Sequence, residues 1–132
     1  ARAYMPEIES IAQDFRGRGV RVLVVHVDPQ ITPARASAHA RQYGVSAPVV
    51  VDRDHRLVRH CGATVTPEAA VFDSSGSLRY LGRIDDRFPA LGSRRAPTTS
   101  ELRDALEAVL SEKDPDVARA PSVGCLIEEL RQ

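Results

Sequence analysis

Apolar residues near the start of the chain recur at intervals of three and four positions, which predicts an amphipathic helix. Gly17 and Gly19 predict the end of this helix, because glycine readily adopts the backbone conformation of a C-cap. The almost continuously apolar, β-branched run at 20–27 predicts a strand buried on both faces, as in a parallel sheet covered by helices. The apolar face of the predicted helix consists of Tyr4, Met5, Ile8, Ile11, Ala12 and Phe15.

The next stretch repeats this alternation of helix and strand. Thr32 and Pro33 are the residue types of an N-cap and a first helical position, so the Ala-rich segment after them is predicted to be a helix. A short buried strand is predicted at 48–51. Asp54 is a candidate cap for a further helix that ends at Gly62. The inner face of that helix is expected to hold Leu57, Val58 and Cys61.

The second half of the chain predicts a hairpin followed by a helix. An apolar strand at 69–72 leads through a turn sequence at 73–76 into a second strand at 78–84. The alternating residues of the second strand favour an antiparallel strand with one wetter face. Thr98 and Glu101 are expected to form the capping box of the last helix.

Two parts of this half have weaker patterns. Residues 85–97 predict a polar loop, in which Asp85 and Asp86 are expected to be solvated or to line a surface that meets a partner. From residue 114 the chain has no clear periodicity. The element order predicts a single α/β domain, but an α/β unit of this kind ordinarily opens with a strand, and none precedes the first helix.

Composition excludes several classes of protein. The 132 residues suit one domain, and 18 basic residues balance 18 acidic ones. Zero net charge argues against a nucleic-acid binder held by bulk charge. Apolar residues make up 42% and charged residues 27%, which is typical of a soluble globular domain and too apolar for a disordered one. No apolar run approaches the roughly 20 residues that cross a bilayer.

The dipeptide Thr66-Pro67 is the most informative short motif. It lies between a predicted helix and a predicted strand, where proline is tolerated at the first strand position. An ordinary trans-proline turn is one interpretation, since only about 5–6% of X–Pro bonds in folded proteins are cis. The other comes from the order of elements around it, which resembles the second half of the thioredoxin fold. That fold has a cis-proline here, beside the redox cysteine, and the backbone before the proline pairs with the substrate.

Longer segments of the chain resemble the redoxin branch of the alkyl hydroperoxide reductase/thiol-specific antioxidant family, which is peroxiredoxin-like. The resemblance covers nearly the whole chain and is especially close to redoxin domains of large bacterial proteins that also carry haem or copper-monooxygenase modules. It implies a thioredoxin-like three-layer sandwich with a mixed sheet, here lacking its first strand. The segments that carry it are Tyr4-Met5-Pro6-Glu7, 24–28, Tyr43-Gly44-Val45, 48–52, GATVTPEA at 62–69, 73–76 and GRIDD at 82–86.

The chain departs from this family at its beginning. The family has a Cys-Pro pair at the start of the first helix, where the helix N-terminus lowers the pKa of the thiol. That pair would precede Ala1, so the nucleophile corresponds to no position in this chain. We therefore expect residues 1–113 to be a redoxin domain that lacks its N-terminal part, and 114–132 to be a C-terminal extension with a Gly-Cys segment. A naturally redox-inactive domain is the alternative.

The two cysteines are the candidate catalytic residues, as resolving thiols. Cys61 is expected to pack on the inner face of a helix, because cysteine is among the most buried residue types, although its nearness to Thr66 leaves a resolving role open. Cys125 follows Gly124, and similar redoxin domains often end in such a Gly-Cys stretch, so the resemblance favours Cys125 as the redox-relevant thiol; an inert tail cysteine is the alternative. A disulfide between Cys61 and Cys125 is a further possibility.

The sequence predicts neither a metal site nor a cofactor. The four histidines lie on different predicted elements, and adjacent helical residues such as His60 and Cys61 do not face the same way. The expected partners are a protein thiol or disulfide, or a peroxide, with a haem- or copper-containing neighbouring domain as a further candidate. No nucleic acid and no membrane segment are expected. The resemblance favours a periplasmic or other extracytoplasmic location.

Two functions remain open at this stage. The first is a thiol–disulfide or peroxide-reducing redoxin, with Thr66 and Pro67 shaping the substrate groove and Cys125 or Cys61 resolving the intermediate. The second is a non-catalytic thioredoxin-like module that docks a neighbouring domain of a larger redox protein. Under either function, residues 1–132 alone are expected to have little activity.

Overall fold

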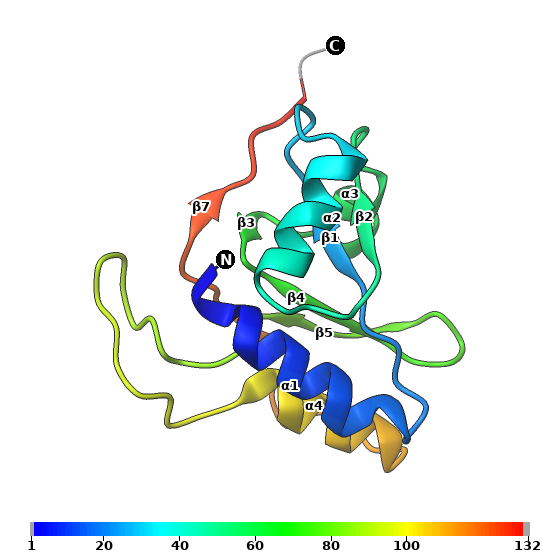
Figure 1. Ribbon diagram of the computed structural model, residues 1–132. Coiled ribbons are helices and arrows are strands. Elements are labelled where there is room, and N and C mark those ends of the chain that lie inside the picture. The colour runs from blue at the N-terminus through cyan, green and yellow to red at the C-terminus, as the bar shows by residue number, and fades with distance from the viewer. Residues whose placement is uncertain (1, 131–132) are drawn as a thin grey trace. The chain divides into compact units, whose positions relative to one another are not determined.

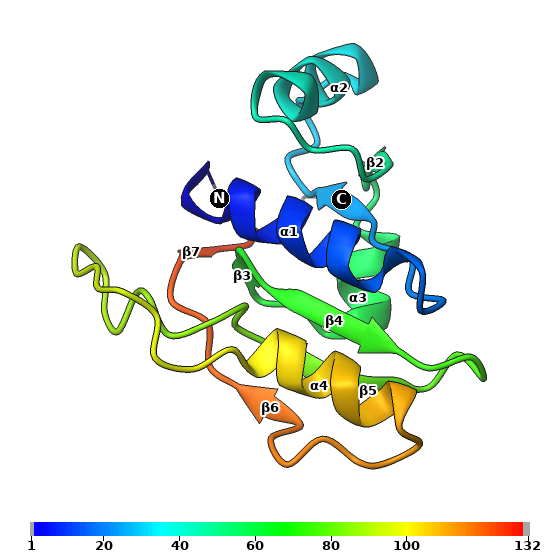
Figure 2. The same ribbon diagram turned by 60° about the horizontal axis from the view of Figure 1, so that its bottom comes forward.

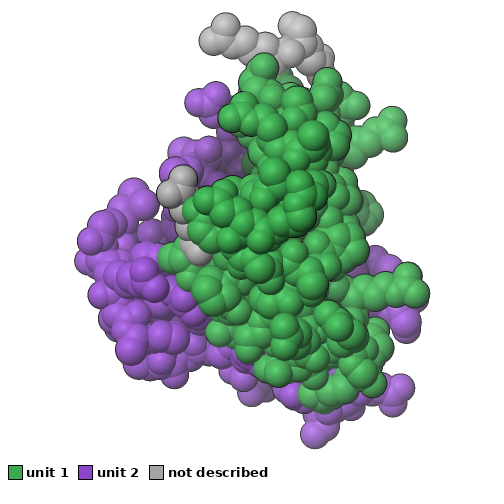
Figure 3. All heavy atoms as spheres, viewed as in Figure 1, with its two compact units in different colours: residues 1–60, 130–132 green, residues 61–129 purple. Residues whose placement is uncertain are grey.

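The computed structural model describes residues 2–130, whose helices and short strands are labelled in Figure 1. The chain divides into two compact units, residues 1–60 with 130–132 and residues 61–129, which Figure 3 colours separately. Among the described residues no helix has both the length and the apolar character needed to cross a membrane. In chain order the elements are a 3-10 helix Arg2–Tyr4, α1 Met5–Arg16, β1 Val24–His26, α2 Pro33–Gln42, β2 Val49–Val51, α3 Arg56–Cys61, β3 Val65–Thr66, β4 Ala69–Phe72, β5 Leu78–Gly82, α4 Glu101–Leu110, β6 Arg119–Ala120 and β7 Cys125–Leu126.

The first unit contains a parallel strand pair and two of the predicted helices. β1 and β2 run parallel, with Val25 opposite Val50, and α2 packs on β2. The Thr32 side chain caps α2 by accepting a hydrogen bond from the backbone N–H of Arg35 at 3.2 Å, as predicted. Residues from α1, α2 and the segment after α2 meet in one apolar cluster, formed by Met5, Ala40, Val45 and Ala47 with Ile8, Val22, Val24, Tyr43 and Val49 packed against it.

Two expectations for this unit are wrong in detail. The strand predicted at 20–27 is only Val24–His26, because its partner β2 is three residues long, and its residues are half-buried rather than buried on both faces. The predicted cap Asp54 is exposed. Instead, the buried carboxylate of Asp52 accepts hydrogen bonds from the backbone N–H groups of Leu57 and Val58, at 3.2 and 2.9 Å.

The second unit contains a three-stranded sheet with a helix packed against it, shown in Figure 2, and a separate pair of short strands, β3 and β7. β4 and β5 form the predicted antiparallel hairpin, and β6 adds to β5 in parallel. In the turn, Gly76 donates its N–H to the carbonyl of Asp73 at 3.0 Å. α4 packs against β5 and β4. The buried apolar residues of the unit are Val71, Tyr80, Leu81, Ile84, Ala105, Leu106 and Ala120.

The start of α4 and the C-terminal segment differ from the sequence prediction. No capping box forms, because Ser100 occupies the N-cap and the Thr98 hydroxyl donates to Asp86 instead. The segment from residue 114, which has no periodic pattern, contributes the strands β6 and β7. Each is two residues long, and so short a strand has no recognisable period.

Candidate functional site

The predicted groove residues Thr66 and Pro67 lie at the end of β3. Gly62 follows α3 with a φ of 75°, a left-handed conformation that favours glycine, and turns the chain toward β3. The Thr66–Pro67 peptide bond is cis, the geometry that the resemblance implies. The backbone N–H of Thr64 donates to the carboxylate of Glu68 at 2.9 Å, which closes the loop around the proline. Thr66 and Pro67 are both half-buried.

The backbone of β3 pairs with the C-terminal segment. β7 runs antiparallel to β3, with Thr66 opposite Cys125 and Val65 opposite Leu126. One residue further, the N–H of Ile127 donates to the carbonyl of Thr64 at 2.8 Å. Figures 1 and 2 both show β7 lying alongside β3. The structure therefore brings three of the four predicted site residues, Thr66, Pro67 and Cys125, to one place.

Two glycines fix the path of the C-terminal segment. A Cβ at Gly82 would clash with the backbone of Ala120, so the glycine allows β6 to lie close to β5. A Cβ at Gly124 would clash with the carbonyl oxygen of Thr66 and contact the ring of Pro67. Gly124 therefore lets the tail approach β3 directly at the Thr66–Pro67 bond. Neither of these close backbone approaches was predicted from the sequence. The one signal present was the glycine directly before Cys125.

The two cysteines differ in exposure and in position. Cys125 is exposed on β7, opposite Thr66. Cys61 is half-buried as the last residue of α3, so its expected packing role is only partly fulfilled, and it takes no part in the β3–β7 pair. No disulfide joins the two. Of the two candidate thiols, only Cys125 lies on the strand that pairs with Thr66.

Asp85 and Asp86, which were expected to be solvated or to line a surface that meets a partner, are 3% and 2% exposed. Asp85 accepts hydrogen bonds from the backbone and guanidinium of Arg87. Asp86 accepts them from the Thr98 hydroxyl, from the backbone N–H groups of Thr98 and Thr99, and from Arg95. These donors, the Thr98 hydroxyl foremost, hold the pKa of Asp86 far below its usual value. Asp86 thereby ties the start of the loop between β5 and α4 to residues 95–99 near its end.

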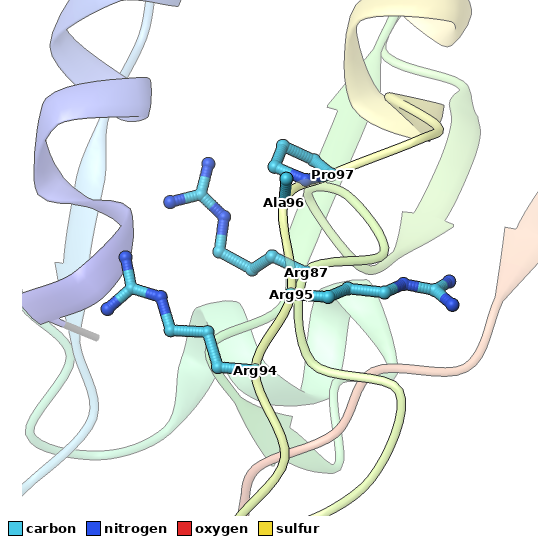
Figure 4. Close-up of a pocket in the computed structure, with 5 residues that line it drawn as sticks. All are labelled: Arg87, Arg94, Arg95, Ala96 and Pro97. Carbon is cyan, nitrogen blue, oxygen red and sulfur yellow. The ribbon is translucent and has the colours of Figure 1, made fainter.

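A shallow hollow of about 450 Å³ lies on the same loop, lined by Arg87, Arg94, Arg95, Ala96 and Pro97. Three arginines could suggest an anion site. Figure 4 shows that their guanidinium groups do not converge, because Arg95 points away from Arg87 and Arg94. Arg87 also forms an ion pair with Asp85 at 2.8 Å, and Arg95 forms one with Asp86 at 2.6 Å. The hollow is therefore not a converging set of anion donors.

The histidines contribute a small aromatic cluster and one hydrogen bond. The rings of His26 and His39 meet edge to face at 5.8 Å between centroids, and His39 also packs on Tyr43. Burial lowers the pKa of His26. A ring nitrogen of His55 lies 2.6 Å from the carbonyl oxygen of Val27. Over residues 2–130 there is no group of three His, Cys, Asp or Glu side chains placed to hold a metal ion.

Solved structures with a similar fold cover almost all of this chain. A hypothetical protein of Sinorhizobium meliloti matches with a TM-score of 0.83 and 29% identity over 98% of this chain and 72% of its own. An uncharacterized conserved protein of Geobacillus kaustophilus matches with a TM-score of 0.79 and 23% identity over 98% of this chain and 70% of its own. No curated protein matches the sequence.

A protein-family model also matches the chain. The family is described as Redoxin, and its model matches residues 2–93, from the 3-10 helix before α1 to the loop after β5. The mixture of helices with parallel and antiparallel strand pairs agrees with the thioredoxin-like fold of that family. The chain belongs to the redoxin family, which is peroxiredoxin-like.

Proposed function

We propose that this domain carries out thiol–disulfide exchange and that Cys125 is its resolving thiol. Membership of the redoxin family supports thiol-based redox chemistry. The observation that carries the assignment is the register of β3 and β7, in which exposed Cys125 faces Thr66 next to Pro67. Cys61 is the last residue of α3 and does not lie on this strand pair. The attacking cysteine is assigned, from the family resemblance, to a Cys-Pro pair before Ala1.

The proposed exchange has two steps. A thiolate of the attacking cysteine displaces one sulfur of a disulfide substrate, which leaves as a thiolate and gives a mixed disulfide. The Cys125 thiolate then attacks the sulfur of the attacking cysteine. The second substrate sulfur leaves as a thiolate, and a disulfide forms within the protein. An external dithiol supplies the two electrons that reduce this disulfide. With a peroxide, the attacking thiolate takes one oxygen and becomes a sulfenic acid, while the O–O bond breaks and the rest of the peroxide leaves as water or an alcohol. The Cys125 thiol then condenses with the sulfenic acid, which forms the same disulfide and releases water.

Turnover in the protein with its N-terminal flanking region tests the proposal. We expect Cys125→Ser to lose most multiple turnover with a dithiol donor and insulin, while Cys61→Ser keeps it. Hydrogen peroxide serves as a second substrate in the same assay. The proposal fails if no cysteine precedes Ala1 in the protein, or if Cys61→Ser abolishes turnover and Cys125→Ser does not. A non-catalytic docking module would then be the better description of the domain. The same conclusion would follow if no form of the protein showed turnover.

A further inference from the structure

Two histidine rings from different elements of the first unit contact each other. His26 is the last residue of β1 and His39 lies in α2, the helix that packs on the neighbouring strand β2 (Figure 1). Their rings meet edge to face, with the centroids 5.8 Å apart. Tyr43, directly after α2, packs on His39 with 4.8 Å between ring centroids. Side chains that can carry charge therefore connect α2 to β1.

Each of these rings has one nitrogen that is shielded from solvent and has no hydrogen-bond partner. Among residues 2–130, nothing bonds to Nε2 of His26 or to Nδ1 of His39. A neutral imidazole tolerates this environment, because one of its tautomers keeps the proton on the opposite nitrogen and leaves a lone pair at the buried one. An imidazolium carries a proton on both nitrogens, so protonation would bury an N–H group that has no acceptor.

The surroundings of His26 also favour its neutral form. Burial is the largest cause that lowers its pKa, and the nearby His39 of α2 lowers it further. Asp28, just after β1, acts in the opposite direction but does not outweigh them. The strand on the other side of the pair places the apolar Val51 opposite His26. The fold therefore holds this ring in the uncharged state.

α2 has little apolar surface that could compensate for a charge at this contact. Its buried residues are Ala36 and Ala40, and every other residue of the helix except His39 is exposed. Alanine buries much less apolar area than leucine or isoleucine, so these contacts stabilise the helix weakly. An isolated helix of ten residues is marginal in water, so α2 depends on its packing. Because Ala40 belongs to the apolar cluster around Met5, movement of α2 would uncover part of that cluster.

We propose that the contact between His26 and His39 is an acid-sensitive switch, which holds α2 on the strand pair while both rings are neutral and releases it when they are protonated. After release the rings meet water and bind protons more readily. A free histidine has a pKa of about 6.5, so the stabilisation of the packed helix is present above that pH and is lost as the pH falls below it. Neither cysteine takes part, so the switch is independent of the proposed exchange reaction.

Amide hydrogen exchange of residues 1–132, corrected for the intrinsic effect of pH on exchange, tests the switch. The two conditions are pH 7.5 and pH 5.5, about one unit on either side of the pKa of free histidine. The reporter at α2 is the amide of Val45, which donates to the carbonyl of Ala40 at 2.9 Å. The reporter of the second unit is the amide of Arg83, which donates to the carbonyl of Ala120 at 3.0 Å.

Protection of Val45 should fall at least about fivefold at pH 5.5, because one histidine that binds a proton only after release accounts for about tenfold. Protection of Arg83 should stay within about twofold, since the second unit contains neither ring. Unchanged protection of Val45 in the wild type overturns the proposal. A parallel loss at Arg83 also overturns it, because the acid would then unfold the whole chain rather than release α2.

A variant without the two rings tests their role directly. His26→Val continues the apolar strand, and His39→Gln places a good helix former in α2. In this double variant, Val45 should be equally protected at both pH values. His60→Gln is the matched control, because His60 is an exposed histidine of α3, and it should keep the pH dependence of the wild type. A pH dependence that persists in the double variant, or that disappears in His60→Gln, overturns the proposal.

An NMR titration of the histidine rings in the wild type needs no variant, and it decides the question if the double variant is unfolded at pH 7.5. The ring of His26 should titrate below the pKa of a free histidine, in the pH range where Val45 loses its protection. A His26 ring that titrates like a free histidine while Val45 stays protected overturns the proposal, because the packed helix would then tolerate the charge.

Discussion

Asp86 is a loop carboxylate whose hydrogen-bond partners lie 9 to 13 positions further along the chain. Its sequence neighbours Asp85 and Arg87 suggest an ordinary charged loop, and nothing local marks Thr98 and Thr99 as donors. The burial of Asp86 therefore could not be predicted from the residues around it. The pair, expected to be solvated or to line a partner-facing surface, is instead buried, and Asp86 is the centre of the hydrogen bonds that hold the loop.

Replacement of Asp86 tests the role of this network. Because the pKa of Asp86 is lowered in the fold, its stabilising contribution is fully present above the unfolded-state pKa of about 3.9. The contribution declines as the pH falls below that value toward the folded-state pKa. Asp86→Asn should therefore lower the thermal midpoint at pH 7, and the difference from the wild type should shrink as the pH falls below 4. A difference that stays constant from pH 7 to pH 3 would contradict this account.

Among the elements, the long helices follow from the sequence and the shortest pieces do not. α1 and α2 have periodic apolar faces and clear signals at their ends, so their predicted limits agree closely with the structure. β6 and β7 are two residues long and their pairing depends on partners distant in the chain. Backbone approach at Gly82 and Gly124, rather than a side-chain pattern, positions them. These close approaches belong to the tertiary structure, and in the sequence they are marked only by isolated glycines.

The cap of α3 gives a test at the level of one element. Asp52 accepts two backbone hydrogen bonds at the start of this helix, whereas Asp54 is exposed. Asp52→Ala should lower the free energy of unfolding by about 1–2 kcal/mol, as removal of a helix cap does. Asp54→Ala, the matched control, should change it by no more than about 0.5 kcal/mol. Denaturant unfolding measures both, and the reverse order of effects would restore Asp54 as the cap.

For the whole molecule, the family and the general fold could be predicted, because the motif segments extend over most of the chain. The position of Cys125 opposite Thr66 was not predicted: the resemblance only favoured Cys125 as the redox-relevant thiol, and the intervening segments carry no pattern that pairs β7 with β3. Sequence spacing alone could not separate Cys61, which is nearer to Thr66 in the chain, from Cys125. The register of one short strand pair makes that distinction.

Residues 1–132 by themselves contain the proposed resolving thiol without an attacking partner. We therefore expect this chain to reduce insulin or consume hydrogen peroxide scarcely faster than the buffer, although it is folded. Protection of backbone amides in hydrogen exchange provides the control for folding. Robust turnover by this chain would mean that Cys61 or Cys125 attacks the substrate, and the assignment of Cys125 as a resolving thiol would be wrong.

The most direct test of the central claim is the disulfide that forms during turnover. The protein with its N-terminal flanking region is treated with one equivalent of a small disulfide, alkylated, and mapped by mass spectrometry of its proteolytic peptides. The account predicts a disulfide between Cys125 and a cysteine that precedes Ala1, with Cys61 alkylated. A disulfide that includes Cys61, or an alkylated Cys125 after turnover, would contradict it.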